Sequence, residues 1–164
     1  MVDLSRLDKQ LEQLSQEIES IAMHLLSNEK LRKLIGNMSD NPLSADAPSV
    51  EEVFNDVLGF LPIFKKTDEK LNRINIIVTD VSNLGEIQTD YMEVGLRIDF
   101  LIPENKWKIP SYIRPLLIMS EIERSISGYK IADLGSLEFD VAELIIPNDG
   151  QAGYSMLYKI QNFK

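Results

Sequence analysis

The sequence predicts an α+β fold: a mainly antiparallel sheet with a helix packed on one face, preceded by N-terminal helices. Apolar residues recur at helical spacing over residues 4–25 and alternate strictly with other residues over 92–102. Helical spacing returns over 113–127, between two groups of strands, which favours antiparallel pairing around that helix. We divide the chain into N-terminal amphipathic helices (1–36) and an α+β domain (37–164), with one compact unit of both as the alternative.

The first helix is predicted over about residues 3–27, with Asp3 or Ser5 as its cap. Leucine and isoleucine follow a 3-4 spacing, at Leu4, Leu7, Leu11, Leu14, Ile18, Ile21 and Leu25. This is the spacing of a coiled-coil seam. After residue 21 the apolar stripe widens, which is typical of a helix that covers a domain core. Packing on its own domain or on a neighbouring subunit, and a parallel self-dimer, are the alternatives.

Two shorter helices follow. Residues 29–35 form the first, and Gly36 is predicted as its C′ residue with a positive φ. Residues 37–49 are dense in Asn, Asp, Ser and Pro, which predicts a loop. Ser49 and Glu52 then form a capping box that opens the next helix, which ends before Pro62.

The period then changes to that of strands, predicted at 74–81, 92–102, 130–132, 137–146 and 154–160. Residues 103–110 form a turn or loop between two prolines. The helix at 113–127 has Pro115 in its first turn and ends at Gly128. Asn148-Asp149-Gly150 predicts a hairpin between the last two strands. The N-terminal helices are expected either to cover the other face of the sheet or to project from it.

Composition narrows the function. The 164 residues carry a net charge of −9 and no cysteine, which excludes disulfides, thiol catalysis and cysteine zinc sites. No apolar run reaches the roughly 20 residues of a membrane helix, and the polar start is not that of a signal peptide, so we expect no membrane partner. Proteins that bind nucleic acid through phosphates usually show a basic face. Here residues 37–62 hold five acids and no base, which predicts a solvated loop and helix start, or a surface that repels DNA or attracts a basic partner.

One possible active site is Glu104-Asn105-Lys106, which follows the strand at 92–102 as an E-x-K pattern. A metal-dependent nuclease needs two or three carboxylates that converge on Mg²⁺, and Asp80, Asp90 and Asp99 are the upstream candidates. However, Asp99 alternates with the apolar face of its strand, so it is predicted to face solvent or a partner. The E-x-K residues also lie beyond Pro103, which ends the strand.

The other chemically notable residues are isolated. His24 is the only histidine and is predicted to be exposed or satisfied locally. Trp107 is predicted to anchor a loop or an interface. Gly128, Gly135, Gly150 and Gly153 are interpreted as turn glycines, with no phosphate-binding loop. We therefore predict no catalytic, cofactor-binding or metal-ligating residue and no cofactor.

Several segments together resemble a known group of proteins. They are NEKLRKLIGNMSDNPLSADAP, RINIIVTDVSN, LRIDFLIPENKW with RPLLIMSEIERSISG, and GYSMLYKIQNF. In the order of their predicted elements and in their residue pattern, over about residues 28–163, they resemble the tail-completion, tail-terminator and neck (head–tail joining) proteins of tailed bacteriophages. The resemblance implies an α+β subunit that forms a hexameric or dodecameric ring around the DNA channel and contacts other neck or tail proteins. It implies no catalysis, and DNA that passes without specific binding.

The expected function is therefore that of a virion structural protein, assembled in the host cytoplasm. A non-catalytic cytosolic adaptor that binds a partner through the N-terminal heptad helix is the alternative, and a metal-dependent nuclease is a distant third. The expected interface residues are Leu4, Leu7, Leu11, Leu14, Ile18, Trp107, Asn148 and Asp149.

Overall fold

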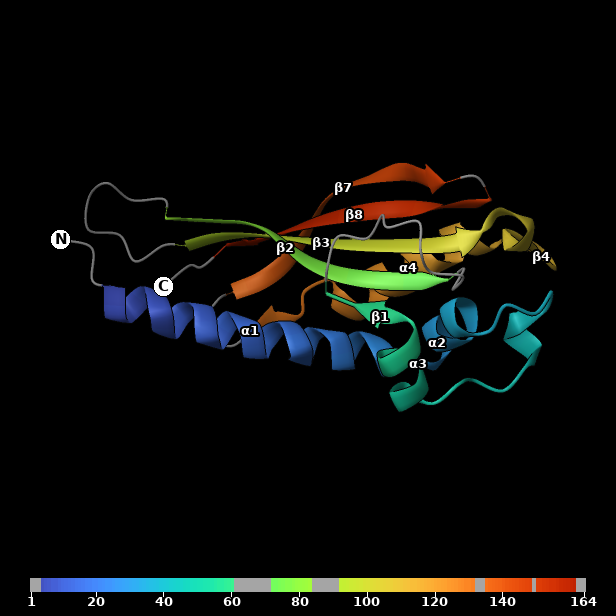
Figure 1. Ribbon diagram of the computed structural model, residues 1–164, viewed down its shortest axis with the longest axis horizontal. Coiled ribbons are helices and arrows are strands. Elements are labelled where there is room, and N and C mark those ends of the chain that lie inside the picture. Colours follow the sequence, from blue (N-terminus) through green and yellow to red (C-terminus); the bar gives the residue numbers. More distant parts are fainter. Residues whose placement is uncertain (1–3, 61–71, 84–91, 132–134, 149, 162–164) are drawn as a thin grey trace.

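A computed structural model describes residues 4–60, 72–83, 92–131, 135–148 and 150–161. It has four α-helices in these ranges and a curled, mostly antiparallel six-stranded sheet, so the α+β prediction is confirmed (Figure 1). The helices are α1 (Leu4–Leu26), α2 (Glu29–Gly36), α3 (Val50–Asp56) and α4 (Arg114–Ile126). The main strands are β2 (Arg73–Asn83), β3 (Met92–Pro103), β7 (Gly135–Asn148) and β8 (Gln151–Gln161).

The sheet has the order β1-β2-β3-β8-β7-β6, in which β1 (Leu58–Gly59) and β6 (Lys130–Ile131) are short. Strand β3 lies at its centre and pairs antiparallel with β2 and with β8. The predicted alternation sets its two faces. Leu96, Ile98 and Phe100 are buried on the core face, and they pair with Tyr158, Met156 and Tyr154 of β8.

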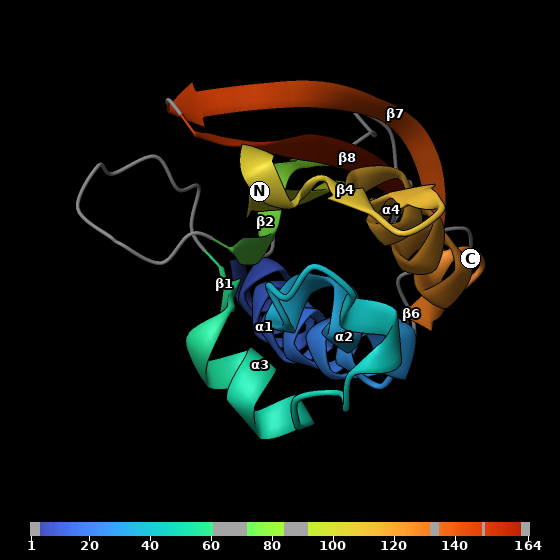
Figure 2. The ribbon, with the colours of Figure 1, turned by 90° about the vertical axis from the view of Figure 1, so that its right-hand side faces the viewer.

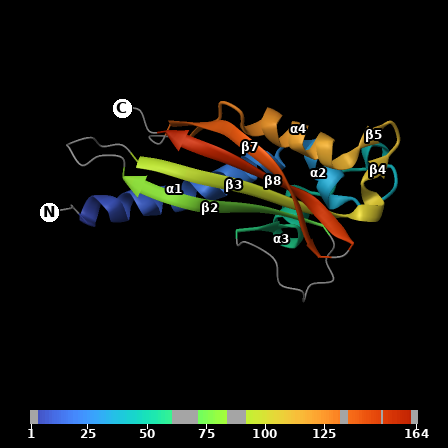
Figure 3. The ribbon, with the colours of Figure 1, turned by 90° about the horizontal axis from the view of Figure 1, so that it is seen from above.

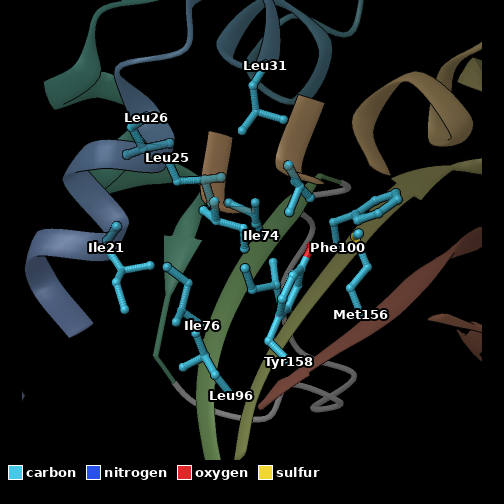
Figure 4. Close-up of a cluster of buried hydrophobic side chains, with 14 of the residues drawn as sticks. Ile21, Leu25, Leu26, Leu31, Ile74, Ile76, Leu96, Phe100, Met156 and Tyr158 are labelled. Atoms are coloured by element: carbon cyan, nitrogen blue, oxygen red, sulfur yellow. The ribbon is translucent and has the colours of Figure 1, made fainter. Parts of the chain in front are cut away.

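The helices cover one face of this sheet. Figures 1 and 2 show α1 and α2 on the same side of the sheet as α4. One hydrophobic cluster joins Ile21 and Leu25 of α1 and Leu31 of α2 to the core face of β2, β3 and β8 (Figure 4). Ile118 of α4 belongs to the same cluster. The expectation that the N-terminal helices cover the other face or project was wrong. The apolar stripe of α1 and that of α4 are both needed to bury a single wide sheet face.

Local sequence signals predict most element ends correctly. The Ser49 side chain accepts a hydrogen bond from the backbone N–H of Glu52, whose carboxylate accepts one from the backbone N–H of Ser49. Pro115 lies in the first turn of α4, and Gly128 follows that helix with a φ of 72°. The first helix begins by Leu4, so Ser5 lies within it; Asp3 is outside the described residues.

Two glycines differ from their predicted roles. Gly36 is the last residue of α2 and has no positive φ; a Cβ there would come within 2.6 Å of Pro48 Cγ. It is therefore a site of close packing between α2 and the segment before α3. Gly153 is not a turn residue but lies inside β8, opposite Leu101 of β3 and Ile145 of β7.

The sequence also missed short elements. Residues 104–106 form a 3-10 turn, and β4 (Lys108–Ile109) and β5 (Tyr112–Ile113) form a two-stranded hairpin where only a loop was predicted. Strand β1 runs parallel to β2 and pairs through Leu58 and Gly59. Two-residue strands have no detectable period, so alternation cannot reveal them.

The burial of α1 gives a direct test of its role. Replacing Ile18, which is buried, with alanine is expected to lower the free energy of unfolding by about 2 kcal/mol, because the side chain leaves a cavity in the core. Replacing Leu11, which is 42% exposed, is expected to cost only about 0.5 kcal/mol. Urea denaturation of both variants measures the difference. Equal, small losses would show that α1 does not stabilise the domain.

Candidate functional site: the open edges of the sheet

The E-x-K residues do not assemble a metal site. Glu104 is exposed, and the ammonium of Lys106 donates a hydrogen bond of 2.8 Å to the carboxylate of Asp40. This contact lowers the pKa of Asp40, through the hydrogen bond first and the charge of Lys106 second. Asp90 lies outside the described residues. Among the residues that the structure describes, no three His, Cys, Asp or Glu side chains gather as a metal site would require.

Asp99 differs most from its prediction. It lies on the sheet face opposite the helices, as the alternation requires, but it is buried rather than exposed. Its cross-strand neighbours are Asn75 and Ser155, and Arg97 Nε lies 3.1 Å from its carboxylate. A buried carboxylate needs such a partner because desolvation penalises its charge. The pairing of Arg97 with Asp99 along one strand gives the position a structural explanation.

The predicted interface residues of α1 separate into two groups. Leu14 and Ile18 are buried in the core of their own domain, so they are not free to form a seam with another helix. Leu11 is 42% exposed. Leu4 and Leu7 lie on the described helix backbone, but their side chains are outside the described part of the chain. Among the seam side chains that the structure describes, only Leu11 is exposed and available for contacts.

An apolar groove borders this helix. It has a volume of about 760 Å³ and lies between α1, α3 and the edge of β2. Ile76, Ile77 and Val78 are consecutive in β2, yet all three line it. Successive side chains of a strand point to opposite faces, so a groove that touches all three lies along the strand edge. The other lining residues are Leu11, Leu14, Ser15, Ile18, Glu19, Phe54 and Phe60.

The opposite edge of the sheet is β7. On its outer side the short strand β6 pairs only with Gly135 and Ser136. Beyond that point no other strand of the described residues pairs with this side of β7. The strand also exposes large apolar side chains, namely Phe139, Val141, Leu144 and Ile146. A long apolar edge with unpaired backbone groups is a template for pairing with another chain.

A third exposed apolar group, which we call the tip patch, lies at the hairpin before α4. It consists of Tyr112, Ile113 and Leu116, each about half exposed. Trp107 is close in sequence but is half buried: its ring stacks on Tyr154 at a centroid distance of 6.3 Å. Trp107 therefore anchors the hairpin on β8. Asn148 ends β7 and pairs with Gln151, while Asp149 lies outside the described residues.

The isolated His24 has a local role. Its Nε2 donates to the backbone carbonyl of Ser125 at 2.7 Å, and its ring lies against Tyr129 at a centroid distance of 4.5 Å. The contact joins α1 to the end of α4, as predicted for a locally satisfied histidine.

A buried charge cluster, which no sequence pattern predicts, lies next to this contact. Glu121 of α4 is 2% exposed and accepts from Asn28 at 3.0 Å, while Lys30 lies 2.9 Å and Arg124 3.3 Å from its carboxylate. Burial opposes ionisation, but the hydrogen bonds from Asn28 and Lys30 and the two positive charges outweigh it, so the pKa of Glu121 is lowered. The cluster fixes the α1–α2 turn on α4. No sequence spacing links residues 28 and 121.

The lowered pKa predicts a pH dependence. A carboxyl group whose folded pKa is depressed stabilises the fold fully above its unfolded value near 4.5, and this contribution disappears as the pH falls through the folded pKa. Glu121→Gln is expected to cost about 1–2 kcal/mol at pH 7 and progressively less below pH 4.5. Urea denaturation from pH 3 to 7 measures it. Glu29→Gln, at an exposed i,i+4 pair with Lys33, is the matched control and should change stability by less than about 0.5 kcal/mol.

Comparison with known proteins adds one finding. A search of curated proteins finds no match. Within the described residues no helix is long and apolar enough to span a membrane. The sequence model of a family described as YomW matches residues 28–160, from the start of α2 into β8, which is most of the chain. The chain therefore belongs to the YomW family, whose name points to a phage-associated protein.

Proposed function

We propose that this protein is a structural subunit of a phage particle, which assembles into a ring at the neck or tail terminus and joins the tail to the head around the DNA channel. Its mechanism is assembly: it caps the tail and docks onto the head connector. The observation that carries the proposal is the arrangement of exposed apolar side chains. They gather on β7, at the groove beside β2, and on the tip patch. Such patches mark protein interaction sites.

Three different surfaces suit a ring subunit better than a simple adaptor. A ring subunit uses two surfaces for its neighbours and at least one more for the next layer of the particle. Family membership supports the phage association. The resemblance to neck and terminator proteins supports a place at the neck or tail terminus of the particle. The adaptor alternative relied on the whole heptad seam, and the burial of Leu14 and Ile18 removes the second half of that seam.

Charge also fits passage of DNA. The net charge is −9, and the acids of the segment before and within α3 are exposed, namely Asp40, Asp46, Glu51, Glu52 and Asp56. Acidic side chains repel the phosphate backbone. A channel lined by them would let DNA slide without binding.

Two measurements test the proposal. The purified protein, examined by light scattering and negative-stain imaging over a wide range of concentrations, is expected to form closed rings. Quantitative mass spectrometry of purified phage particles is expected to find the protein at a fixed copy number, and particles made without it are expected to appear as separate heads and tails. A protein that is absent from the purified particles is not a virion subunit, whatever its oligomeric state.

A further inference from the structure

We infer that the ring is closed by sheet extension: strand β7 of one copy pairs with the open edge of β2 of the next copy, and its side chains fill the groove beside α1. The inference rests on the proposed ring function and names its joint. The partner is a second copy of this chain, bound head to tail.

The positions of the two open edges favour this joint. Strands β2 and β7 lie on opposite sides of the central pair β3 and β8 (Figure 3). Strand β1 covers β2 only at Ile74 and Asn75, so in the described part of the chain no strand pairs with this side of β2 after residue 75. One sheet thus carries two incomplete edges. Joining unlike edges of identical subunits is a heterologous contact, which closes into a ring when the rotation permits.

The directions of the strands favour the same joint. Strand β2 is antiparallel to β3, β3 to β8, and β8 to β7, so β7 and β2 run in opposite directions. A copy rotated about an axis roughly along the strands keeps its strand directions. Its β2 then meets β7 of the first copy in antiparallel orientation, which continues the alternation of the sheet and is the more stable pairing.

The exposed side chains of β7 also match the groove beside β2. Leu144 pairs with Tyr154, and Phe139 pairs with Tyr158, so both lie on the core face of β7. They are 53% and 47% exposed. In an extended sheet the core face of the added strand faces the same side as the core face of β2. That side holds the groove, where Leu11 and Phe54 are among the lining residues.

Irregularities in β7 limit the pairing to one segment. Its register with β8 shifts between Phe139 and Val141, and again between Ile145 and Asn148. Bulges and proline, here Pro147, blunt an edge against uncontrolled aggregation. The regular stretch between them covers residues 141–145, about the commonest length of a strand, so Leu144 lies within the pairing segment and Phe139 just before it.

The surface area that this joint buries determines which oligomer it can stabilise. Five residues at about 3.4 Å each span about 17 Å, and a sheet is roughly 10 Å thick, so the strand edge covers roughly 170 Å² per partner. Stable pairs bury about 800 Å² per partner. Even with the groove contacts added, a lone joint is therefore weak. A closed ring holds every subunit at two joints, so we expect rings and monomers with few open intermediates.

Mixing two blocked variants tests the joint. Leu144→Lys places a charge on β7, and Leu11→Lys places one in the groove; both side chains are about half exposed, so thermal melts should show folded proteins. Each variant alone is expected to lose rings, by light scattering and negative-stain imaging. An equal mixture is expected to give one-to-one heterodimers at high concentration, because each such pair has one intact joint. Met23→Lys, at a 46% exposed methionine of α1 that lines neither the groove nor the tip patch, is the control and should keep its rings.

The experiment distinguishes a failure of the edge pairing from a failure of the ring function. Rings that persist in Leu144→Lys or Leu11→Lys overturn the edge pairing and leave the ring function standing. Dimers of Leu11→Lys that Leu144→Lys abolishes would instead show β7 pairing with β7 about a two-fold axis. A large loss of melting temperature in Leu11→Lys with rings intact would show that the groove is filled by the same chain. A wild type that stays monomeric at every concentration overturns the ring function together with its joint.

Discussion

Replacing Arg114 with alanine is expected to lower the free energy of unfolding by about 4 kcal/mol. Arg114 is the first residue of α4, and its side chain is fully buried. Its guanidinium donates to the backbone carbonyl of Asn37 at 3.1 Å and to that of Ser39 at 2.5 Å. Alanine leaves two acceptors without their partner and a cavity between α4 and the segment after α2. Burial lowers the pKa of Arg114, but an arginine side chain in a protein stays charged.

Two further variants separate the effect of the guanidinium hydrogen bonds from the effect of losing any arginine of α4. Arg114→Lys keeps a positive charge, but an ammonium lacks the planar fork that serves both carbonyls, so an intermediate loss of about 2 kcal/mol is expected. Arg124→Ala removes an exposed arginine of the same helix and should cost less than about 1 kcal/mol. Urea denaturation at pH 7 measures all three. A loss in Arg114→Ala no greater than that in Arg124→Ala would mean that the 37–39 segment needs no anchor.

The regular elements were predictable because their periods are long enough to recognise. Strand β3 alternates over eleven residues, and α1 repeats its apolar spacing over about six turns. Both signals come from a stripe that must be buried. The ends of helices were predictable where a side chain caps the backbone, as Ser49 and Glu52 do at the start of α3.

What the sequence did not reveal depends on residues that are distant along the chain. The burial of Arg114 requires the carbonyls of residues 37 and 39, and that of Glu121 requires Asn28 and Lys30. Alternation placed Asp99 on the correct face but could not show that this face is buried at its centre. The candidate surfaces were missed for the same reason. An open edge is defined by the absence of a neighbouring strand, and strand order is a property of the assembled sheet.

Replacing Gly153 with alanine is expected to lower the free energy of unfolding by about 3 kcal/mol or more. Gly153 is the third residue of β8 and lies between Leu101 of β3 and Ile145 of β7. A Cβ there would overlap the backbone oxygen of Phe100 and lie 2.7 Å from its carbonyl carbon. No rotamer change relieves contact with a backbone atom, so β3 and β8 must separate. Because β8 also holds β7, the substitution should weaken both ladders and, with them, the β7 edge proposed to close the ring.

Gly128→Ala is the matched control, since it isolates the conformational cost of adding a Cβ. Gly128 has a φ of 72°, and a Cβ there would meet nothing within 4 Å. Its replacement should cost about 1 kcal/mol, the penalty of a left-handed conformation alone. Urea denaturation compares the two variants, and hydrogen exchange of the β8 amides reports whether the ladder opens. If Gly153→Ala costs no more than Gly128→Ala, then β3 and β8 do not need the close approach that glycine permits.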